Sequence, residues 1–248
     1  MLKDALGLKQ PGVVACVGAG GKTSVVQSLA AELDGAVVVT STTKMFCRQV
    51  DNYALVMLDH CSDGVAEVAK LLLKQPRVAW FAGQVREKII GLPPEWVDKL
   101  AVCVPDAYIL VEADGARRCL LKAPSCSEPV IPERTAMTVG VLNIGAMGQM
   151  LSPENTHRLE LVTAIIQRQP GDRITWQDIA RLAVHPQGIF QYARGTKVLL
   201  LSGNQGPVAR QAVKEIAGYV KAAQVGIERV VAATGYGDAM RASAVFVL

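Results

Sequence analysis

The sequence has 248 residues, of which 50% are hydrophobic, 19% charged and 5% aromatic, and its formal net charge is +4. This length corresponds to roughly one or two domains of ~150 residues and is enough to bury a sizeable core. The composition excludes intrinsic disorder, collagen and disulfide scaffolds. Charged or helix-breaking residues interrupt every apolar stretch well before the ~18 residues that a membrane span needs.

The amino-terminal segment and the cysteines indicate where the protein works. The first ten residues include Lys3, Asp4 and Lys9, and they lack the ~7–15-residue apolar core of a signal peptide. The six cysteines form no Cys-x-x-Cys pair, so we expect free thiols, most of them in the core. Charges are scattered and aromatic residues are few, which argues against nucleic acid. We therefore expect a cytoplasmic protein with no membrane or nucleic-acid partner.

Short apolar runs rich in Val, Ile and Leu alternate with segments of helical period, as in a parallel sheet buried on both faces. Strands are expected at residues 13–17, 36–40, 54–58, 78–81, 108–112, 137–142, 198–201 and 230–233. Helices are expected at residues 23–33, 62–73, 94–100, 152–167, 175–183 and 208–222. The pattern predicts one α/β domain over residues 1–248, a P-loop NTPase-like, doubly wound and mostly parallel sheet, with a helical insertion at about 152–194.

The strongest motif follows the first expected strand. It consists of Gly18, Ala19, Gly20, Gly21, Lys22, Thr23 and Ser24, and a helix follows it directly. In a phosphate-binding loop the backbone N–H groups surround the phosphates, the lysine reaches the β and γ phosphates, and the hydroxyl binds Mg²⁺. Cys16 stands where the usual spacing has the first glycine, so this is the short form known from Mur-type ligases. The alternative is a glycine-rich turn with an exposed lysine.

An acidic residue ends a later apolar strand, as a phosphate-binding loop requires. Glu112 follows the run at 108–111, and Asp114 and Gly115 complete an E-x-x-G pattern that resembles metal-centre-assembly GTPases. We predict that Thr23 and Glu112 hold Mg²⁺ and that Glu112 or Asp114 orients the attacking water. Together with Lys22 these carboxylates are the candidate catalytic residues. The alternative is an ordinary strand exit into an Asp- and Gly-rich turn.

Two further polar segments belong to the same expected sheet edge. Thr42, Thr43 and Lys44 follow the second strand and are candidate ligand-binding residues, although a polar loop with a helix cap explains them equally well. A basic group after the acidic strand has two open interpretations, a contact with a second anion or the γ-phosphate, or a solvated loop. Its members are Arg117, Arg118 and Lys122.

The base of the nucleotide is less clear. A guanine-reading Asn-Lys-x-Asp motif is missing from the ends of the late strands, at residues 142–145 and 202–205. Without that aspartate the guanine N–H donors lack their usual acceptor. Of ATP and GTP, ATP is therefore favoured by elimination.

An ordered set of short motifs resembles one family. The motifs are GAGGKT at 18–23, TTK at 42–44, VEADGA at 111–116, LKAP at 121–124, EPVIP at 128–132 and His157-Arg158 with Glu160. Together they resemble the YqeC-like family, described as accessory proteins of selenium-dependent molybdenum hydroxylases. The resemblance covers most of the first 165 residues. It implies a P-loop nucleotide-binding protein that works with a molybdenum hydroxylase or its cofactor-assembly proteins and handles the selenium or the cofactor.

The leading hypothesis is a Mg²⁺-dependent nucleoside triphosphate hydrolase that acts as such a maturation factor. One alternative is a nucleotide-gated binding module without hydrolysis, and another is a small-molecule kinase or ligase. Cys119 and Cys126 are the thiols to test for sulfur or selenium chemistry. The arginines beside Cys119 favour a thiolate, but a structural role for this cysteine is the preferred interpretation. For His157 and Arg158 a capping or surface role is as reasonable as a ligand contact.

Overall fold

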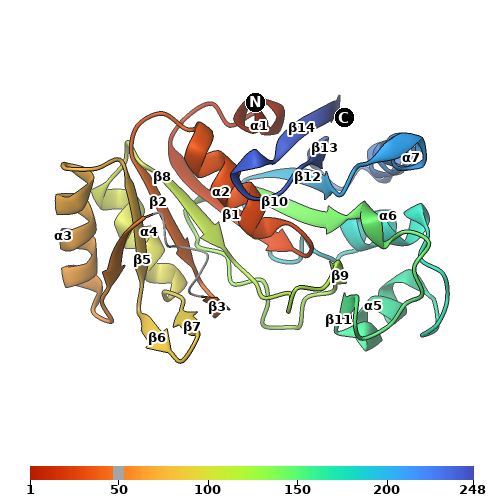
Figure 1. Ribbon diagram of the computed structural model, residues 1–248, viewed down its shortest axis with the longest axis horizontal. Helices are drawn as coiled ribbons and strands as arrows, with labels where there is room; N and C mark the ends of the chain where they lie inside the picture. The colour runs from red at the N-terminus through yellow and green to blue at the C-terminus, as the bar shows by residue number, and fades with distance from the viewer. Residues whose placement is uncertain (47–52) are drawn as a thin grey trace.

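The chain folds around one large sheet in the computed structural model, which describes residues 1–46 and 53–248 (Figure 1). Within these residues nine strands pair in the order β14-β13-β12-β10-β1-β8-β2-β5-β4, and all but β14 are parallel. The strands are β1 (Gly12–Gly18), β2 (Val37–Ser41), β4 (Ala54–Met57), β5 (Arg77–Phe81), β8 (Tyr108–Glu112), β10 (Thr135–Asn143), β12 (Thr196–Ser202), β13 (Ile227–Thr234) and β14 (Arg241–Val247). The α/β fold class, with a doubly wound and mostly parallel sheet, is confirmed.

Two small sheets lie outside the large one. β6 (Gly83–Val85) and β7 (Lys88–Ile90) form a hairpin beside β3 (Met45–Phe46), and β9 (Leu121–Lys122) pairs with β11 (Thr156–His157). The helices are α1 (Leu2–Leu6), α2 (Lys22–Glu32), α3 (Cys61–Leu72), α4 (Pro94–Cys103), α5 (Leu159–Ile166), α6 (Trp176–Val184) and α7 (Gly206–Ala223), with 3₁₀ turns η2 (Ile144–Ala146) and η3 (Gly237–Ala239).

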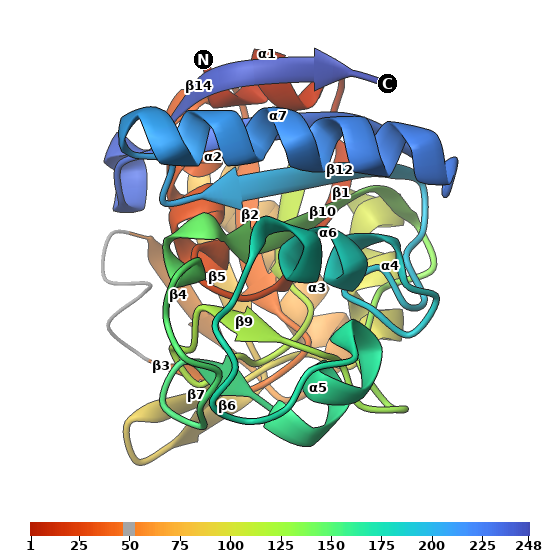
Figure 2. The ribbon, with the colours of Figure 1, turned by 90° about the vertical axis from the view of Figure 1, so that its right-hand side faces the viewer.

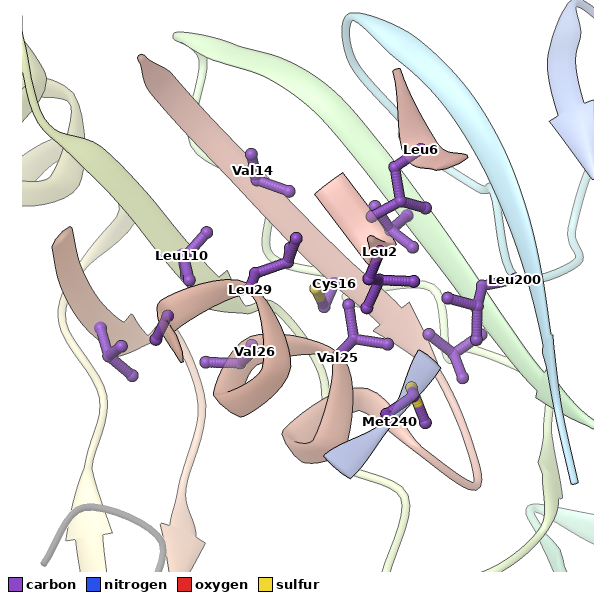
Figure 3. Packing of buried hydrophobic residues seen from close by; sticks show 14 of the residues in the cluster. Leu2, Leu6, Val14, Cys16, Val25, Val26, Leu29, Leu110, Leu200 and Met240 are labelled. Carbon is purple, nitrogen blue, oxygen red and sulfur yellow. The ribbon is translucent and has the colours of Figure 1, made fainter. Parts of the chain in front are cut away.

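Both faces of the large sheet are buried, which explains the continuous apolar runs. Alternate residues of β1 belong to different core clusters. Val14 and Cys16 pack with α1 and α2 (Figure 3), whereas Val13 and Ala15 pack on the other face with α3 and α4. Further along the sheet that second face is covered by α6 and α7, with α5 beyond them (Figure 2). The crossovers place β1 at the centre, directly between β8 and β10.

The helix expected at residues 152–167 is wrong in its first half, because α5 begins only at Leu159. The Asn155 side chain takes the place of helical bonding: its Oδ1 accepts from the Ser152 N–H at 3.3 Å, and its Nδ2 donates to the Met150 carbonyl at 2.8 Å. Such local side-chain bonds offer the backbone an alternative to a helix. Arg158 then precedes the helix in the left-handed region, at φ 58°.

The cysteines were expected mostly in the core, and this is corrected for the part of the chain that the structure describes. Cys16 and Cys119 are buried, Cys61 is half-buried, and Cys103 and Cys126 are exposed. These five are free thiols, as expected. Cys47 lies outside the described residues.

Candidate functional site

The loop between β1 and α2 has the strand, loop and helix order that the sequence predicts. β1 ends at Gly18 and α2 begins at Lys22. Gly18 has φ 94°, and a Cβ atom there would lie 2.2 Å from the Val141 carbonyl oxygen. The same oxygen accepts a 2.9 Å hydrogen bond from the Ala19 N–H. Only glycine therefore fits at position 18.

Side chains from two strand ends hold the loop at Gly20. Asn143, which ends β10, donates from Nδ2 to the Gly20 carbonyl oxygen at 3.1 Å, and Ser202, which ends β12, donates from Oγ at 2.6 Å. We missed this role from the sequence, where the only signal was a polar residue at the end of each apolar strand. These two bonds fix the Gly20 carbonyl oxygen. The first N–H groups of α2 have no intrahelical acceptors, so they are available to donate to an anion such as phosphate.

The Lys22 ammonium lies inside the loop. Its Nζ donates to the Gly18 carbonyl oxygen at 2.6 Å and lies 2.8 Å from Asp114 Oδ1, and the side chain is only 5% exposed. Burial alone would lower the Lys22 pKa, but the Asp114 and Glu112 carboxylates outweigh it and raise that pKa. Lys22 is therefore a fixed positive charge at neutral pH.

Glu112 and Thr23 meet at the same place although 89 residues separate them. Strands β8 and β1 pair directly, with Glu112 opposite Cys16, and Thr23 Oγ1 donates to Glu112 Oε1 at 2.7 Å. Burial raises the Glu112 pKa, while Lys22 and the Thr23 hydroxyl counteract it. Burial likewise raises the pKa of the Cys16 thiol behind them.

A hydroxyl and a carboxylate this close suit Mg²⁺, which prefers oxygen ligands and usually takes few from the protein. The described residues contain no cluster of three or more His, Cys, Asp or Glu that could hold a metal. Mg²⁺ at Thr23 and Glu112 would thus rely on phosphate and water for its other ligands. The predicted pair fits this role.

Asp114 lies beneath the loop and joins it to a second lysine. Its Oδ2 accepts from the Gly18 N–H at 2.9 Å and lies 3.0 Å from Lys122 Nζ, while Oδ1 faces Lys22. The side chain is almost fully buried. These contacts brace the loop, and the orienting of water by Asp114 stays a prediction.

A chain of alternating charges continues from Asp114 away from the loop. Lys122 Nζ donates to Glu128 Oε2 at 2.9 Å and to the Gly115 carbonyl at 2.7 Å. Arg158 binds both Glu128 oxygens, at 2.8 and 2.9 Å. Burial would raise the Glu128 pKa, but Arg158 and Lys122 lower it to about 2. The solvated loop and the surface role that we weighed for Lys122 and Arg158 are therefore wrong.

Only part of the segment after β2, residues 42–44, lines the candidate site. Thr42 donates from Oγ1 to the Val130 carbonyl oxygen at 2.6 Å, so its hydroxyl holds a loop. Thr43 and Lys44 line the cavity described next. Ser41, which directly precedes these residues, donates from Oγ to the Glu112 carbonyl at 2.8 Å and fixes the end of β8.

A cavity of about 1640 Å³ contains these groups. Of the residues that line it, we call residues 20–24 with Glu112 the loop wall. We call residues 116–120, 153, 154 and 156–160 the far wall. Figure 1 shows β11 and α5 of the far wall beyond the carboxyl ends of the strands.

The loop after β13 also reaches the cavity. Ser24 lies in the first turn of α2, and its Oγ accepts a 3.0 Å hydrogen bond from the Gly237 N–H. The adjacent Tyr236 is 71% exposed and lines the cavity. Tyr236 was not predicted as a site residue, because a single aromatic residue after a strand carries no distinctive signal.

The far wall contains the remaining candidates. Arg117 and Arg118 are exposed, and Cys119 beneath them is buried. Burial raises the Cys119 pKa more than Arg117 lowers it, so the thiolate that we considered is disfavoured. Burial and the charges of Arg158, Lys122 and Arg117 lower the His157 pKa to about 4.

Comparison with known proteins assigns the family. A family model described as "YqeC protein" matches residues 14–160, more than half of the chain. The chain belongs to the YqeC family. One relative, "Uncharacterized protein YqeC" of Escherichia coli (strain K12), is 35% identical over 190 residues, covering 74% of this chain and 72% of the relative. No solved structure matches.

The segment matched to the YqeC family runs from β1 to the start of α5. It includes Lys22, Thr23, Glu112 and the charged network as far as Arg158. Tyr236 lies outside it. No helix in the described ranges is both long and apolar enough to cross a membrane.

Proposed function

We propose that this member of the YqeC family binds a nucleoside triphosphate at the loop wall and hydrolyses it with Mg²⁺. The observation that carries the proposal is the Thr23–Glu112 hydrogen bond at 2.7 Å beside the buried Lys22 ammonium, at the mouth of a glycine loop. A structural lysine alone would not need a hydroxyl and a carboxylate paired next to it. Phosphoryl transfer needs this set, because its catalysis is mostly positioning and charge neutralisation.

Each residue of the loop wall has a defined role in this proposal. Lys22 neutralises the β and γ phosphates, and the N–H groups at the start of α2 donate to their oxygens. Thr23 and Glu112 hold Mg²⁺, which when bound neutralises phosphate charge and orients the phosphate oxygens. Asn143 and Ser202 keep the loop in shape through the Gly20 carbonyl.

The nucleobase lies against Tyr236 in this proposal. The Gly237–Ser24 bond ties the loop after β13 to the first turn of α2, so the exposed ring is near the phosphate site. An aromatic face stacks on any base. The Asn143 amide donates to the loop, and Asn204 Nδ2 donates to Ser243 Oγ at 2.8 Å, so each side chain already has a structural contact. ATP as the preferred nucleotide stays a prediction.

The cellular role follows from the family resemblance. We propose that the hydrolase acts as an accessory protein in the maturation of a selenium-dependent molybdenum hydroxylase. Nucleotide turnover would drive one step in the delivery or assembly of the selenium or the cofactor. The partner would be the hydroxylase itself or one of its cofactor-assembly proteins.

A second candidate function is a nucleotide-gated binding module without hydrolysis. It is favoured by Asp114, whose oxygens are already engaged by Gly18, Lys22 and Lys122. In that case the nucleotide would alter the charged network without being cleaved. Phosphate release separates the two candidates.

The experiment is a binding screen of nucleoside triphosphates with Mg²⁺, followed by phosphate release from the tightest binder. For hydrolysis we expect the Glu112→Gln variant to lower the rate about a hundredfold, since it loses the charge that holds Mg²⁺. Glu95→Gln, which removes an exposed carboxylate of α4 outside the cavity lining, is the matched control and should keep the rate. Failure of the wild-type protein to bind any nucleotide refutes the proposal, and tight binding without phosphate release favours the second candidate.

A further inference from the structure

The cavity is larger than one small-molecule ligand requires. Pockets for such ligands usually measure ~300–1,000 Å³, whereas this cavity measures about 1640 Å³. A nucleotide on the loop wall with its base at Tyr236 leaves the far wall open. The far wall therefore has room for a second molecule.

The three arginines that line the cavity have an unusual backbone in common. Arg117, Arg118 and Arg158 all have positive φ, at 47°, 64° and 58°. Residues other than glycine are strained in this region, and such residues cluster at functional sites. Two of them are consecutive and exposed, and a Cys119 N–H to Ala116 carbonyl bond of 2.9 Å closes the turn that presents them.

The charges of the far wall differ from those of the loop wall. Arg158 is neutralised by Glu128 in a two-bond ion pair. Apart from that pair and from Lys22, Glu112 and Asp114 at the glycine loop, the cavity lining has Arg117 and Arg118 on the far wall and Lys44 and Lys88 outside both walls. Their counterparts are the exposed Glu154 and Glu160. His157 lies among these side chains, and burial together with the charges of Arg158, Lys122 and Arg117 lowers its pKa to about 4. Leu159 and Pro153 add apolar surface.

We propose that the far wall is a second binding site, for an organic phosphate that is held by Arg117 and Arg118. Guanidinium groups bind phosphate oxygens with paired, directed hydrogen bonds, and the apolar residues beside them contact the organic part. The site lines the same cavity as the loop wall. Its ligand would be a co-substrate or effector of the nucleotide reaction, and the site does not depend on the loop wall for its own contacts.

The test uses phenyl phosphate as the probe, in calorimetric titrations of the full chain saturated with Mg²⁺ and a non-hydrolysable ATP analogue. We expect binding to the wild type and at least tenfold weaker binding to Arg117→Asn/Arg118→Asn, because asparagine tolerates the left-handed backbone but lacks the charge. The double change to lysine should restore part of the affinity. Arg210→Asn, at an exposed arginine of α7, is the matched control and should bind as the wild type does.

Three results would overturn the proposal: no binding of phenyl phosphate, undiminished binding to the double asparagine variant, or simple competition with the nucleotide. If the protein binds no nucleotide, the same titrations are run on the free protein with Lys22→Ala added. Binding that survives Lys22→Ala and is lost with the arginines supports the second site even though the proposed function has failed. Binding that is lost with Lys22→Ala and survives the changes at Arg117 and Arg118 refutes the second site.

A spectroscopic measurement tests the location. Nuclear magnetic resonance should show that phenyl phosphate raises the pKa of His157 from about 4, because a bound anion offsets Arg117, Lys122 and Arg158. The histidines at 60 and 185 lie outside the cavity lining and serve as internal controls. An unchanged His157 pKa with bound probe would contradict a site on the far wall.

Discussion

The loop wall and the far wall face the same cavity, yet different forces hold them. The loop wall is fixed by hydrogen bonds to backbone groups, from Asn143 and Ser202 to Gly20 and from Ala19 to Val141. The far wall is joined to the sheet by buried charges that run from Asp114 through Lys122 and Glu128 to Arg158. Asp114 belongs to both, because it also binds the Gly18 N–H.

This difference predicts different sensitivities. Neutral hydrogen bonds to a backbone respond little to pH, whereas a buried ion-pair chain loses stability when one of its members loses its charge. A change in the far wall should therefore affect the whole fold. A change in the loop wall should mainly affect ligand binding.

The largest expected effect comes from removing the central charge of the far-wall network. Lys122→Met leaves Asp114 and Glu128 facing each other without the cation between them, and we expect a loss of about 3–5 kcal/mol in the free energy of unfolding. Urea titration measures it.

The matched control is Lys70→Met, which breaks an exposed Lys70–Glu67 pair and should cost less than about 1 kcal/mol. Adding Glu128→Gln to Lys122→Met should recover part of the loss, because one of the two facing carboxylates is then neutral. Equal effects of Lys122→Met and Lys70→Met would show that the network does not hold the far wall.

The second-largest effect is expected from acid, which should lower the contribution of the far-wall network to the free energy of unfolding. Arg158 and Lys122 lower the Glu128 pKa from its usual 4.5 to about 2, so the unfolded chain binds the proton more readily. The stability from this carboxylate is on the order of 3 kcal/mol, is fully present above about pH 4.5, and is lost as the pH falls toward 2.

Unfolding free energies of the wild type and Glu128→Gln, measured from pH 7 down to pH 3, test this prediction. The two curves should converge as the pH falls, because the glutamine variant already lacks the charge. Curves that stay parallel over this range would mean that Glu128 does not titrate as the ion pairs require.

A smaller effect is expected at Tyr236. Loss of base stacking in Tyr236→Ala should weaken nucleotide binding by about 1–2 kcal/mol, roughly 5- to 30-fold, while Tyr236→Phe keeps the ring and the affinity. Tripolyphosphate, which has no base, should bind the wild type and both variants equally in calorimetric titrations. A loss of tripolyphosphate affinity in Tyr236→Ala would indicate a role in loop shape instead of base contact.

The loop wall was predictable from the sequence because its signals are contiguous or belong to strand ends. Gly18 to Ser24 form one segment between a strand and a helix, and Glu112 ends an apolar run. Parallel strands bring such ends to one edge, so the Thr23–Glu112 contact follows from the fold class.

The far wall was not predictable, because its contacts join residues in irregular segments. Glu128 and Arg158 are 30 positions apart, and the nearby strands β9 and β11 have two residues each, too few for a periodic signal. The Asn155 side chain replaced a helical turn, and Arg158 takes a backbone conformation that sequence patterns do not reveal. β14, at the edge of the large sheet, was missed because Arg241–Val247 contains two alanines and a serine and alternates only weakly.

The central claim, that the loop wall binds a nucleoside triphosphate, is tested most directly by calorimetric titration of Mg²⁺–ATP into the wild type and Lys22→Ala. The control is Lys214→Ala on the exposed face of α7, and near-ultraviolet circular dichroism verifies that all three are folded. We predict binding to the wild type and the control and a loss of about a hundredfold or more in Lys22→Ala, since the buried ammonium is the main counter-charge for the phosphates. Equal affinity in all three proteins would contradict the claim.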